Sequence, residues 1–299
     1  MPDSIAAKLI DALHAGADVP PGCRVNHARG LLVEGRFLGV PLAAQFSASP
    51  MFDGAELPLI ARFSDAGPDP RIRQDSPQAE PRGLAVRIGQ DSPLVLVGHS
   101  LEGFPAQDPQ AFLAFIQALN TQHAVPGSLQ AHLAAHPPAQ RFDQLRHDAL
   151  PTGYASRSYH MLHAYRLTAA DGQTRTGRLT IRGRNADGAH KALAGRNCMN
   201  EALRHAMEAG PVALELAFTP APEQGATDDL STAWPGHGSS MLLGYLMLER
   251  IAPDQDAQRV LVFDPSILPA GIEFAGDPLL KARLQAYRLA AERRLRGVP

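Results

Sequence analysis

The segment "LVLVGHSLEGFPAQDP", from Leu94 to Pro109, places a serine after an apolar run, where a nucleophile could stand. In serine hydrolases the pattern G-x-S-x-G carries the serine on a sharp turn, which leaves no room for a side chain two residues later. Here Glu102 occupies that place, and Gly103 comes one residue too late. The pattern therefore favours a buried strand that ends in a polar turn, with a serine hydrolase acting through Ser100 as an alternative.

The last helical segment carries a phenol and a guanidinium on one face. Arg283 lies four residues before Tyr287. Because side chains four residues apart on a helix are neighbours, the guanidinium is expected to reach the phenol oxygen. A lone tyrosine on an apolar helical face is also typical of an ordinary core position.

The remaining metal-ligating residue types are scattered. His160 and His163 are three apart on a predicted strand, so they are expected on opposite faces and do not favour a shared metal ion. Cys23 and Cys198 are the only two cysteines. They are too few for a disulfide framework and too isolated for a zinc site, which predicts two free thiols.

The composition excludes several classes of function. The chain has 299 residues, enough for one large domain or two closely packed ones. Lysine and arginine number 28 against 30 acidic residues, for a net charge of -2, and no basic run indicates nucleic-acid binding. There is no secretory leader and no run of apolar residues long enough to span a membrane, so a soluble cytoplasmic protein with a small-molecule partner is expected.

The first half of the chain must position these residues with short strands. A helix is predicted from Ser4 to His14, followed by strand patterns between Val25 and Val97 that are separated by Gly, Pro and Asp clusters. A helix with Asp108 as N-cap and Pro109 at its first position comes next. Polar helical sequence continues to about residue 150.

Strand patterns return in the second half, at "SYHMLHAYRLT", "GRLTIRG" and "VALELAFTP", with a helix near Asn200 to Glu208. The segment "TPAPEQGATDDLSTAWPGHGSS" is predicted to be a long loop. Asp277 and Pro278 indicate the start of the last helix, and Gly297 its end. This order favours an α+β fold built on an antiparallel barrel or sandwich.

Six short motifs, taken together and in order, resemble the haem catalases, and specifically their small members, the catalase-related peroxidases. They are "RVNHARG" (24–30), "ARFSDAG" (61–67), "PRGLAVRI" (81–88), "SYHMLHAYR" (158–166), "FDPSILPAGI" (263–272) and "ARLQAY" (282–287). The resemblance implies a closed antiparallel β-barrel with surrounding helices, in one haem domain spanning residues 1–299 with a short N-terminal helix at about 4–15. It also implies one b-type haem and a C-terminal helix that carries the haem ligand.

The resemblance assigns the iron and the haem carboxylates to particular side chains. Tyr287 matches the proximal iron ligand, and Arg283 matches its partner, whose positive charge favours the phenolate. Arg24, Arg62 and Arg294 match the cations that hold the haem propionates. Seen alone, a residue such as Arg62 would more simply be explained as a surface ion pair.

The distal side of the haem is assigned in the same way. His27 matches the histidine that moves a proton between the two peroxide oxygens, and Ser64 matches the hydroxyl that orients this imidazole. The register of the opening segment places His99 where larger catalases carry an asparagine, as an imidazole expected to titrate near neutral pH. It also places Phe112 against the haem face. Asn26 departs from the family, which has an apolar residue before the distal histidine.

The resemblance implies a haem peroxidase that uses hydrogen peroxide or organic hydroperoxides to oxidise a small organic reductant, with weak catalase activity. The alternatives are an isomerase or dehydratase of fatty-acid hydroperoxides and a haem-binding protein without turnover. The sequence begins shortly before His27 and ends shortly after Tyr287. A monomer or homodimer with an open pocket, lacking the outer parts of large catalases, is therefore expected.

Overall fold

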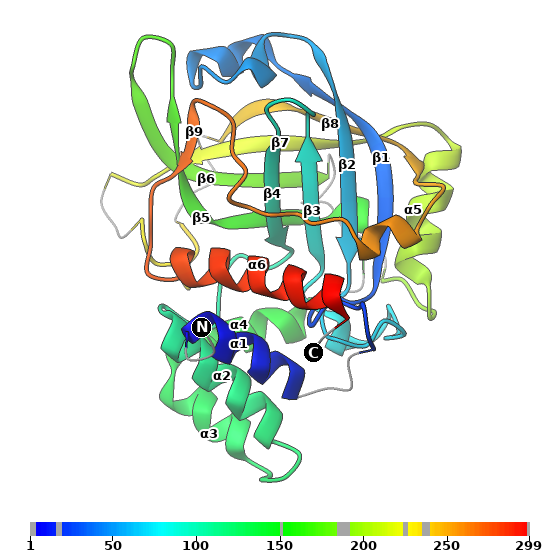
Figure 1. Cartoon of the computed structure of the whole chain (residues 1–299), viewed down its shortest axis with the longest axis vertical. Coiled ribbons are helices and arrows are strands. Elements are labelled where there is room, and N and C mark those ends of the chain that lie inside the picture. The colour runs from blue at the N-terminus through cyan, green and yellow to red at the C-terminus, as the bar shows by residue number, and fades with distance from the viewer. Residues whose placement is uncertain are drawn as a thin grey trace.

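Eight antiparallel strands form a closed barrel in the computed structural model (Figure 1). The structure describes residues 4–15, 20–149, 152–183, 192–223, 227–234 and 240–297. Neighbouring strands follow the order β4-β3-β2-β1-β8-β7-β6-β5-β9, and a pairing between β4 and β5 closes the barrel. The predicted α+β fold with a closed antiparallel barrel is thus confirmed.

The elements follow one another along the chain in two groups of strands separated by helices. The strands are β1 (Gly30–Gly39), β2 (Glu56–Ser64), β3 (Gly83–Ile88), β4 (Leu94–His99), β5 (Ser158–Thr168), β6 (Thr174–Gly183), β7 (Val212–Pro220), β8 (Met241–Ile251) and β9 (Ile272–Phe274). The α-helices of the described residues are α1 (Ile5–Ala15), α2 (Pro109–Thr121), α3 (Ser128–Ala135), α4 (Pro137–Asp148), α5 (Cys198–Glu208) and α6 (Leu280–Arg296). Short 3₁₀ turns are η1 (Pro41–Gln45), η2 (Pro50–Phe52), η3 (Pro77–Ala79), η4 (Tyr154–Ser156) and η5 (Asp256–Arg259).

Strand alternation separates the interior of the barrel from the functional face. In β2, Leu59, Ala61 and Phe63 point into the barrel core and are at most 4% exposed. Arg62 and Ser64 therefore point to the outer face, because successive side chains of a strand alternate. Each large apolar side chain buried in the core contributes about 1.5–3 kcal/mol relative to exposure, which keeps β2 in this register.

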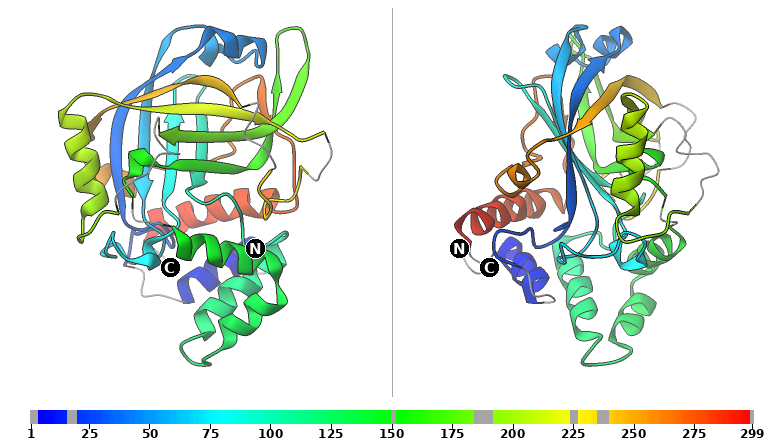
Figure 2. Two further views of the ribbon diagram at one scale, coloured as in Figure 1. Left: turned by 180° about the vertical axis from the view of Figure 1, so that it is seen from behind. Right: turned by 90° about the vertical axis from the view of Figure 1, so that its right-hand side faces the viewer.

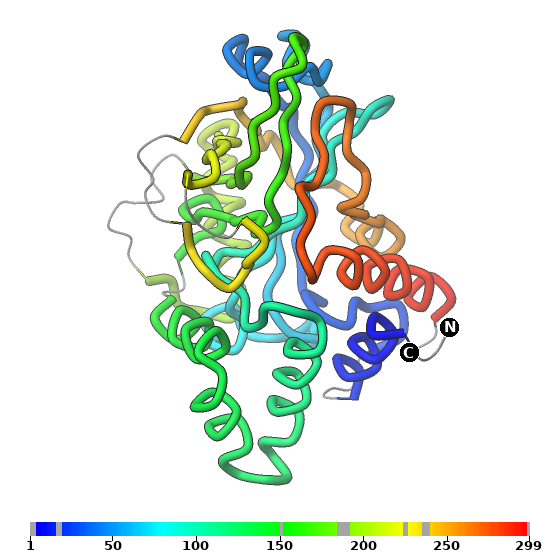
Figure 3. Tube along the Cα trace, turned by 90° about the vertical axis from the view of Figure 1, so that its left-hand side faces the viewer, coloured from blue at the N-terminus to red at the C-terminus, as the bar shows by residue number. Residues whose placement is uncertain are grey.

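The helices cover the outer face and one end of the barrel. In Figure 1, α6 crosses this end in red, and α1 packs against both α6 and α2. Figure 2 shows α2 to α4 beside the barrel end, and Figure 3 shows α2 and α3 extending away from the strands as a hairpin, with α4 leading back towards the barrel. Residues from the two ends of the described chain are therefore brought together over the same outer strands.

Local sequence signals set the helix ends. The Asp108 carboxylate accepts hydrogen bonds from Gln110 and Ala111 backbone N–H groups at 2.9 and 2.8 Å, which confirms its role as N-cap of α2. Helix α6 begins three residues after the predicted Asp277, whose side chain accepts the backbone N–H groups of both Leu279 and Leu280 at 2.9 Å. Gly297 ends α6 in the left-handed conformation, as predicted.

Candidate functional site

One cavity of about 320 Å³ lies between the outer face of the barrel and the helices α1 and α6. Its apolar lining includes Leu9, Ile10, Leu13, Leu84, Val97, Phe104, Leu162 and Phe263. All nine residues that the resemblance assigned to the haem site also line it: Arg24, His27, Arg62, Ser64, His99, Phe112, Arg283, Tyr287 and Arg294. The fold therefore brings together residues that lie as much as 270 positions apart in the sequence, from Arg24 to Arg294.

His27 and Ser64 form the hydrogen-bonded pair of this cavity. Ser64 Oγ lies 3.1 Å from His27 Nδ1. Gly83, the cross-strand partner of Ser64, allows this approach: a Cβ atom at Gly83 would lie 2.5 Å from Ser64 Oγ and 2.8 Å from His27 Nδ1. Any larger residue at position 83 would displace the pair.

The backbone turn at His27 is strained and is held by its neighbour. His27 has φ 54°, the only positive value among the described non-glycine residues. The Asn26 side-chain oxygen accepts the backbone N–H groups of His27 at 2.9 Å and of Gly67 at 2.8 Å. This capping role explains why a polar residue precedes His27. Burial, followed by the charge of Arg62, lowers the pKa of His27 to about 4, so the imidazole is neutral at pH 7.

Three arginines meet at one side of the cavity without a carboxylate partner among the described residues. Arg24 donates to the carbonyls of Gln258 and Leu261 at 2.8 and 3.0 Å, and Arg294 donates to the Leu261 carbonyl at 3.1 Å. Arg62, 3% exposed, also makes only neutral contacts: it donates to the Gln258 side chain and to the carbonyls of residues 27 and 28. This side of the cavity therefore carries concentrated positive charge.

The pKa values of these arginines express the same imbalance. Burial, then repulsion by Arg62 and Arg294, lowers the pKa of Arg24 to about 8. Burial also lowers the pKa of Arg62 to about 10. Because a guanidinium keeps its proton in proteins, the cluster is best stabilised by an anion in the cavity.

Tyr287 and Arg283 face the cavity from α6, but not in the predicted contact. The guanidinium carbon of Arg283 lies 5.4 Å from the Tyr287 ring centroid, over the ring. Its Nη2 donates to the Val97 carbonyl at 2.8 Å, which ties α6 to β4. Among the described residues Arg283 makes no hydrogen bond to the Tyr287 oxygen, and its positive charge lies over the ring instead.

His163 and Asp277 also belong to this side of the site and were missed by the sequence analysis. His163 lines the cavity, and its Nδ1 lies 2.5 Å from Asp277 Oδ2, with both side chains 1% exposed. The His163 Nε2 has no hydrogen-bond partner among the described residues. Burial, then Arg283, lowers the pKa of His163 to about 4. The sequence signal for His163 was the motif "SYHMLHAYR", and Asp277 was noted only as the start of the last helix.

The prediction that His160 and His163 face opposite sides is also wrong. Met161 pairs with Leu179 and Ala164 with Arg178, so β5 inserts two extra residues opposite one step of β6. This bulge turns the strand locally, and both histidines line the cavity.

Comparisons with known proteins agree with this architecture. No protein-family model matches the chain. The chain is 29% identical over 298 residues to a catalase-related peroxidase of Mycolicibacterium paratuberculosis, covering 96% of this chain and 94% of the relative. It is 27% identical over 301 residues to a catalase-related peroxidase of Synechococcus elongatus, covering 97% of this chain and 89% of the relative.

Solved catalases share the fold. A fungal catalase and catalase A of Saccharomyces cerevisiae each align with a TM-score of 0.81, at 20% and 22% identity. Both alignments cover 93% of this chain but only 60% and 62% of those longer chains. The chain is a small catalase-like protein.

In this catalase-like chain, His99 lines the cavity as a neutral hydrogen-bond donor. Its Nδ1 accepts the Leu101 backbone N–H at 3.3 Å, so the proton of the neutral ring lies on Nε2. Burial, followed by His27 and His160, lowers the pKa of His99 to about 3. The expected titration near neutral pH is therefore wrong, because the buried ring stays uncharged at pH 7.

Ser100, next to His99, is not placed as a nucleophile. It is absent from the residues that line this cavity. Its Oγ accepts the Arg82 backbone N–H at 3.0 Å and lies 3.4 Å from both Glu80 and Arg157 side chains. The Ser100 hydroxyl is thus held by these neighbours, outside the cavity lining.

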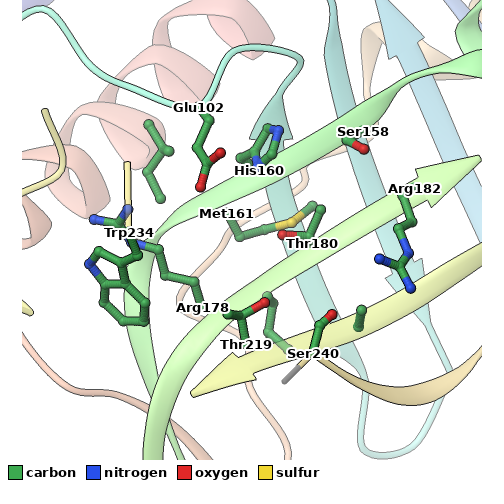
Figure 4. Close-up of a pocket in the computed structure, with 13 residues that line it drawn as sticks. Glu102, Ser158, His160, Met161, Arg178, Thr180, Arg182, Thr219, Trp234 and Ser240 are labelled. Atoms are coloured by element: carbon green, nitrogen blue, oxygen red, sulfur yellow. The ribbon is translucent and has the colours of Figure 1, made fainter. Parts of the chain in front are cut away.

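A second, smaller cavity of about 160 Å³ lies against β5 and β6 (Figure 4). His160 and Leu162 line both cavities. Arg178 stacks on Trp234 with its guanidinium carbon 4.4 Å from the ring centroid, and donates to the carbonyls of Asp229 and Thr232. Arg178 thereby fastens the segment 229–234 to the barrel.

The described residues hold neither a cluster of metal ligands nor a helix that could span a membrane. No group of three or more His, Cys, Asp and Glu side chains in these segments is arranged to hold a metal ion. Within the same segments, every helix is too short or too polar to cross a membrane.

Proposed function

We propose that this chain is a haem-dependent peroxidase, a single domain that binds one haem b in the 320 Å³ cavity. The observation that carries the proposal is the arrangement of the cavity: a tyrosine and an arginine on α6, a hydrogen-bonded His27 and Ser64 on the barrel side, and three arginines without carboxylate partners. The related catalase-related peroxidases support this choice of reaction.

The residues present fit a haem. Its two propionates would supply the negative charge that Arg24, Arg62 and Arg294 lack among the described residues, and forked guanidinium groups suit carboxylates. The apolar lining suits the porphyrin, with Phe112 beside it and Phe104 packed on Phe112 at 4.7 Å between ring centroids.

Tyr287 would hold the iron. The Arg283 guanidinium over its ring places a positive charge beside the phenol, which favours the ionised phenolate ligand. His163, whose Nε2 is unpartnered among the described residues, would complete this proximal side together with Asp277. When bound, haem supplies a redox-active iron at which peroxide is cleaved.

The distal residues move and hold the peroxide protons. With Nδ1–H of His27 donating to Ser64 Oγ, the neutral Nε2 is free to take a proton from one peroxide oxygen and return it to the other. His99 Nε2–H would donate a hydrogen bond to the same substrate. Hydrogen peroxide would take up two electrons and two protons to give two water molecules, and an organic hydroperoxide would give one alcohol and one water. Two molecules of a small organic reductant would each supply one electron and one proton.

The experiment separates this function from its alternatives. Purified chain is titrated with haem and with haem dimethyl ester, which lacks free carboxylates, and then mixed with peroxide and a phenolic dye. We expect a Soret band, binding of haem at least tenfold tighter than of the ester, and dye oxidation. Arg24→Gln should shrink this preference, since one charged partner is worth roughly a factor of ten.

Other outcomes identify the alternatives. Conversion of a fatty-acid hydroperoxide without consumption of dye would favour the isomerase or dehydratase. Haem binding without any reaction would favour a binding protein, and an absent Soret band would overturn the proposal.

A further inference from the structure

A row of cross-strand partners runs over five strands beside the cavity, and all of its members except Gly30 line the cavity. Gly30 pairs with Ser64, Ser64 with Gly83, Gly83 with His99, and His99 with His160. The row crosses β1 to β5, and His27 packs over its middle at Gly83. The distances between the side chains of His27, Ser64 and His99 therefore depend on the register in which the ends of these strands are held.

A second row lies one residue further along three of these strands. Asp65 follows Ser64, Arg82 precedes Gly83, and Ser100 follows His99. Arg82 Nη1 donates to Asp65 at 2.6 Å, and the Arg82 backbone N–H donates to Ser100 Oγ at 3.0 Å. The Ser100 backbone N–H in turn donates to the Arg82 carbonyl at 2.8 Å. The strand ends are therefore joined directly behind the cavity-facing row.

Arg82 is the centre of this second row. Its side chain is 0% exposed. Its Nε donates to Glu80 at 3.0 Å and its Nη2 to the Gln74 carbonyl at 2.6 Å, in addition to the bond with Asp65. Glu80 is itself held by Arg157 at 2.8 and 3.0 Å. The planar fork of an arginine can make these bonds together, whereas the single ammonium of a lysine cannot.

Asp65 connects this centre to the loop that carries His27. The Asp65 carboxylate, 0% exposed, accepts from Tyr154 at 2.8 Å and from the Gln74 side chain at 3.0 Å, and lies 3.5 Å from Arg29 Nε. The Asp65 backbone N–H donates to the Arg29 carbonyl at 3.1 Å. Arg29 comes two residues after His27, and Asp65 comes directly after Ser64. Asp65 therefore links the segment that carries His27 to the strand that carries Ser64.

We propose that Arg82 and Asp65 are positioning residues that hold Ser64 and His27 in hydrogen-bonding geometry from behind the barrel row. Neither residue lines the cavity. The inference rests on the proposed function only for its catalytic consequence. His27 and Ser64 must be fixed to within about 0.5 Å to act together. The buried Arg82 guanidinium, bonded to Asp65, supplies this constraint at the end of β2 and the start of β3.

The test observes the His27 imidazole directly and does not depend on turnover. Full chain with ¹⁵N-labelled histidine is examined by NMR in a diamagnetic state, either reduced under carbon monoxide when haem is present or as purified when it is not. In the wild type we expect one neutral tautomer, with the proton on Nδ1. In Asp65→Asn and Arg82→Lys we expect exchange between tautomers, because Ser64 no longer stays within bonding distance.

Kinetics provide the second readout. In both variants the rate of reaction with peroxide should fall on the order of ten- to a hundredfold, the effect of a small misplacement of a reacting group, with the KM for the reductant unchanged. A slow wild-type reaction with a fixed tautomer would count against the proposed peroxidase, while leaving the positioning role intact.

Two controls separate positioning from stability. Arg182→Lys makes the same exchange in an arginine that pairs with Glu215 on the neighbouring strand, 3.1 Å away. Leu216→Ala removes buried core volume far from the row. If Asp65→Asn and Arg82→Lys lose only stability, as Leu216→Ala does, and keep one His27 tautomer, the proposal is overturned. If neither variant folds, Ser100→Ala decides, since it keeps Arg82 and Asp65 but removes the acceptor of the Arg82 backbone N–H and the longer contacts of this hydroxyl with Glu80 and Arg157. An unchanged His27 tautomer in Ser100→Ala also overturns the proposal.

Discussion

Ser64 Oγ lies 3.1 Å from His27 Nδ1, although the two residues are 37 positions apart in the chain. The contact depends on three local features: a strand end that directs Ser64 outward, a left-handed backbone at His27, and a glycine at position 83. Because the hydroxyl binds Nδ1, the other ring nitrogen is left for substrate. The pair therefore has the geometry of a base oriented by its neighbour.

The first prediction removes the base of this pair. His27→Ala should slow the reaction with peroxide by roughly a hundredfold or more, which is what a positioned proton transfer contributes. Stopped-flow absorption after mixing with peroxide measures this rate. His123→Ala, which changes an exposed histidine outside the cavity, should react like the wild type. Equal rates in the two variants would remove His27 from the mechanism.

Much of this site could be predicted because six short motifs resemble the catalases, and the resemblance assigned roles to residues that the fold brings to one cavity. Local sequence alone placed the Asp108 cap of α2, whereas Arg62 and Ser64 were assigned by the resemblance, and their shared direction follows from the alternation of β2. His163 was misplaced because its direction depends on the two-residue bulge in β5, which only pairing with β6 creates. The orientation of Arg283 was missed for a similar reason, since the Val97 carbonyl that binds it is 186 positions away.

The second prediction concerns the proximal ligand. Tyr287→Phe should fold but bind haem weakly or with a different axial ligand. The substitution removes the phenol oxygen, which is the only side-chain oxygen among the α6 residues that line the cavity. Haem content and the charge-transfer band of the absorption spectrum measure this. Tyr245→Phe, on β8 and outside the cavity, is the matched control. An unaltered band in Tyr287→Phe would show that another residue holds the iron.

The third prediction concerns acid stability. Burial lowers the folded-state pKa values of His27 and His163 to about 4 and of His99 to about 3, below the ordinary 6.5 expected in the unfolded chain. Between these limits the unfolded chain binds more protons, so the stability present above pH 6.5 is lost as the pH falls towards 3–4. The loss should be on the order of 1 kcal/mol or more for each histidine.

Denaturant unfolding between pH 7 and pH 4 measures this dependence. His99→Asn should flatten it, because one of the three depressed groups is removed. His123→Asn should keep the wild-type slope, since this side chain is exposed. A His99→Asn slope equal to that of the wild type would mean that His99 is not buried as a neutral ring.

The last prediction concerns the balance between two reactions of peroxide. His99 donates from Nε2 into the cavity, as an asparagine amide can, but its ring is larger and is held against Phe142 at 6.0 Å between ring centroids. The bulk should leave less room for a second peroxide molecule, while single-electron donors act at a distance. We therefore expect weak oxygen evolution in the wild type.

His99→Asn should raise oxygen evolution from hydrogen peroxide several-fold relative to oxidation of a phenolic dye, measured with an oxygen electrode and by dye absorbance. His123→Asn should leave the ratio unchanged. Fast oxygen evolution in the wild type, or a ratio that does not move in His99→Asn, would show that this ring does not restrict the substrate side of the cavity.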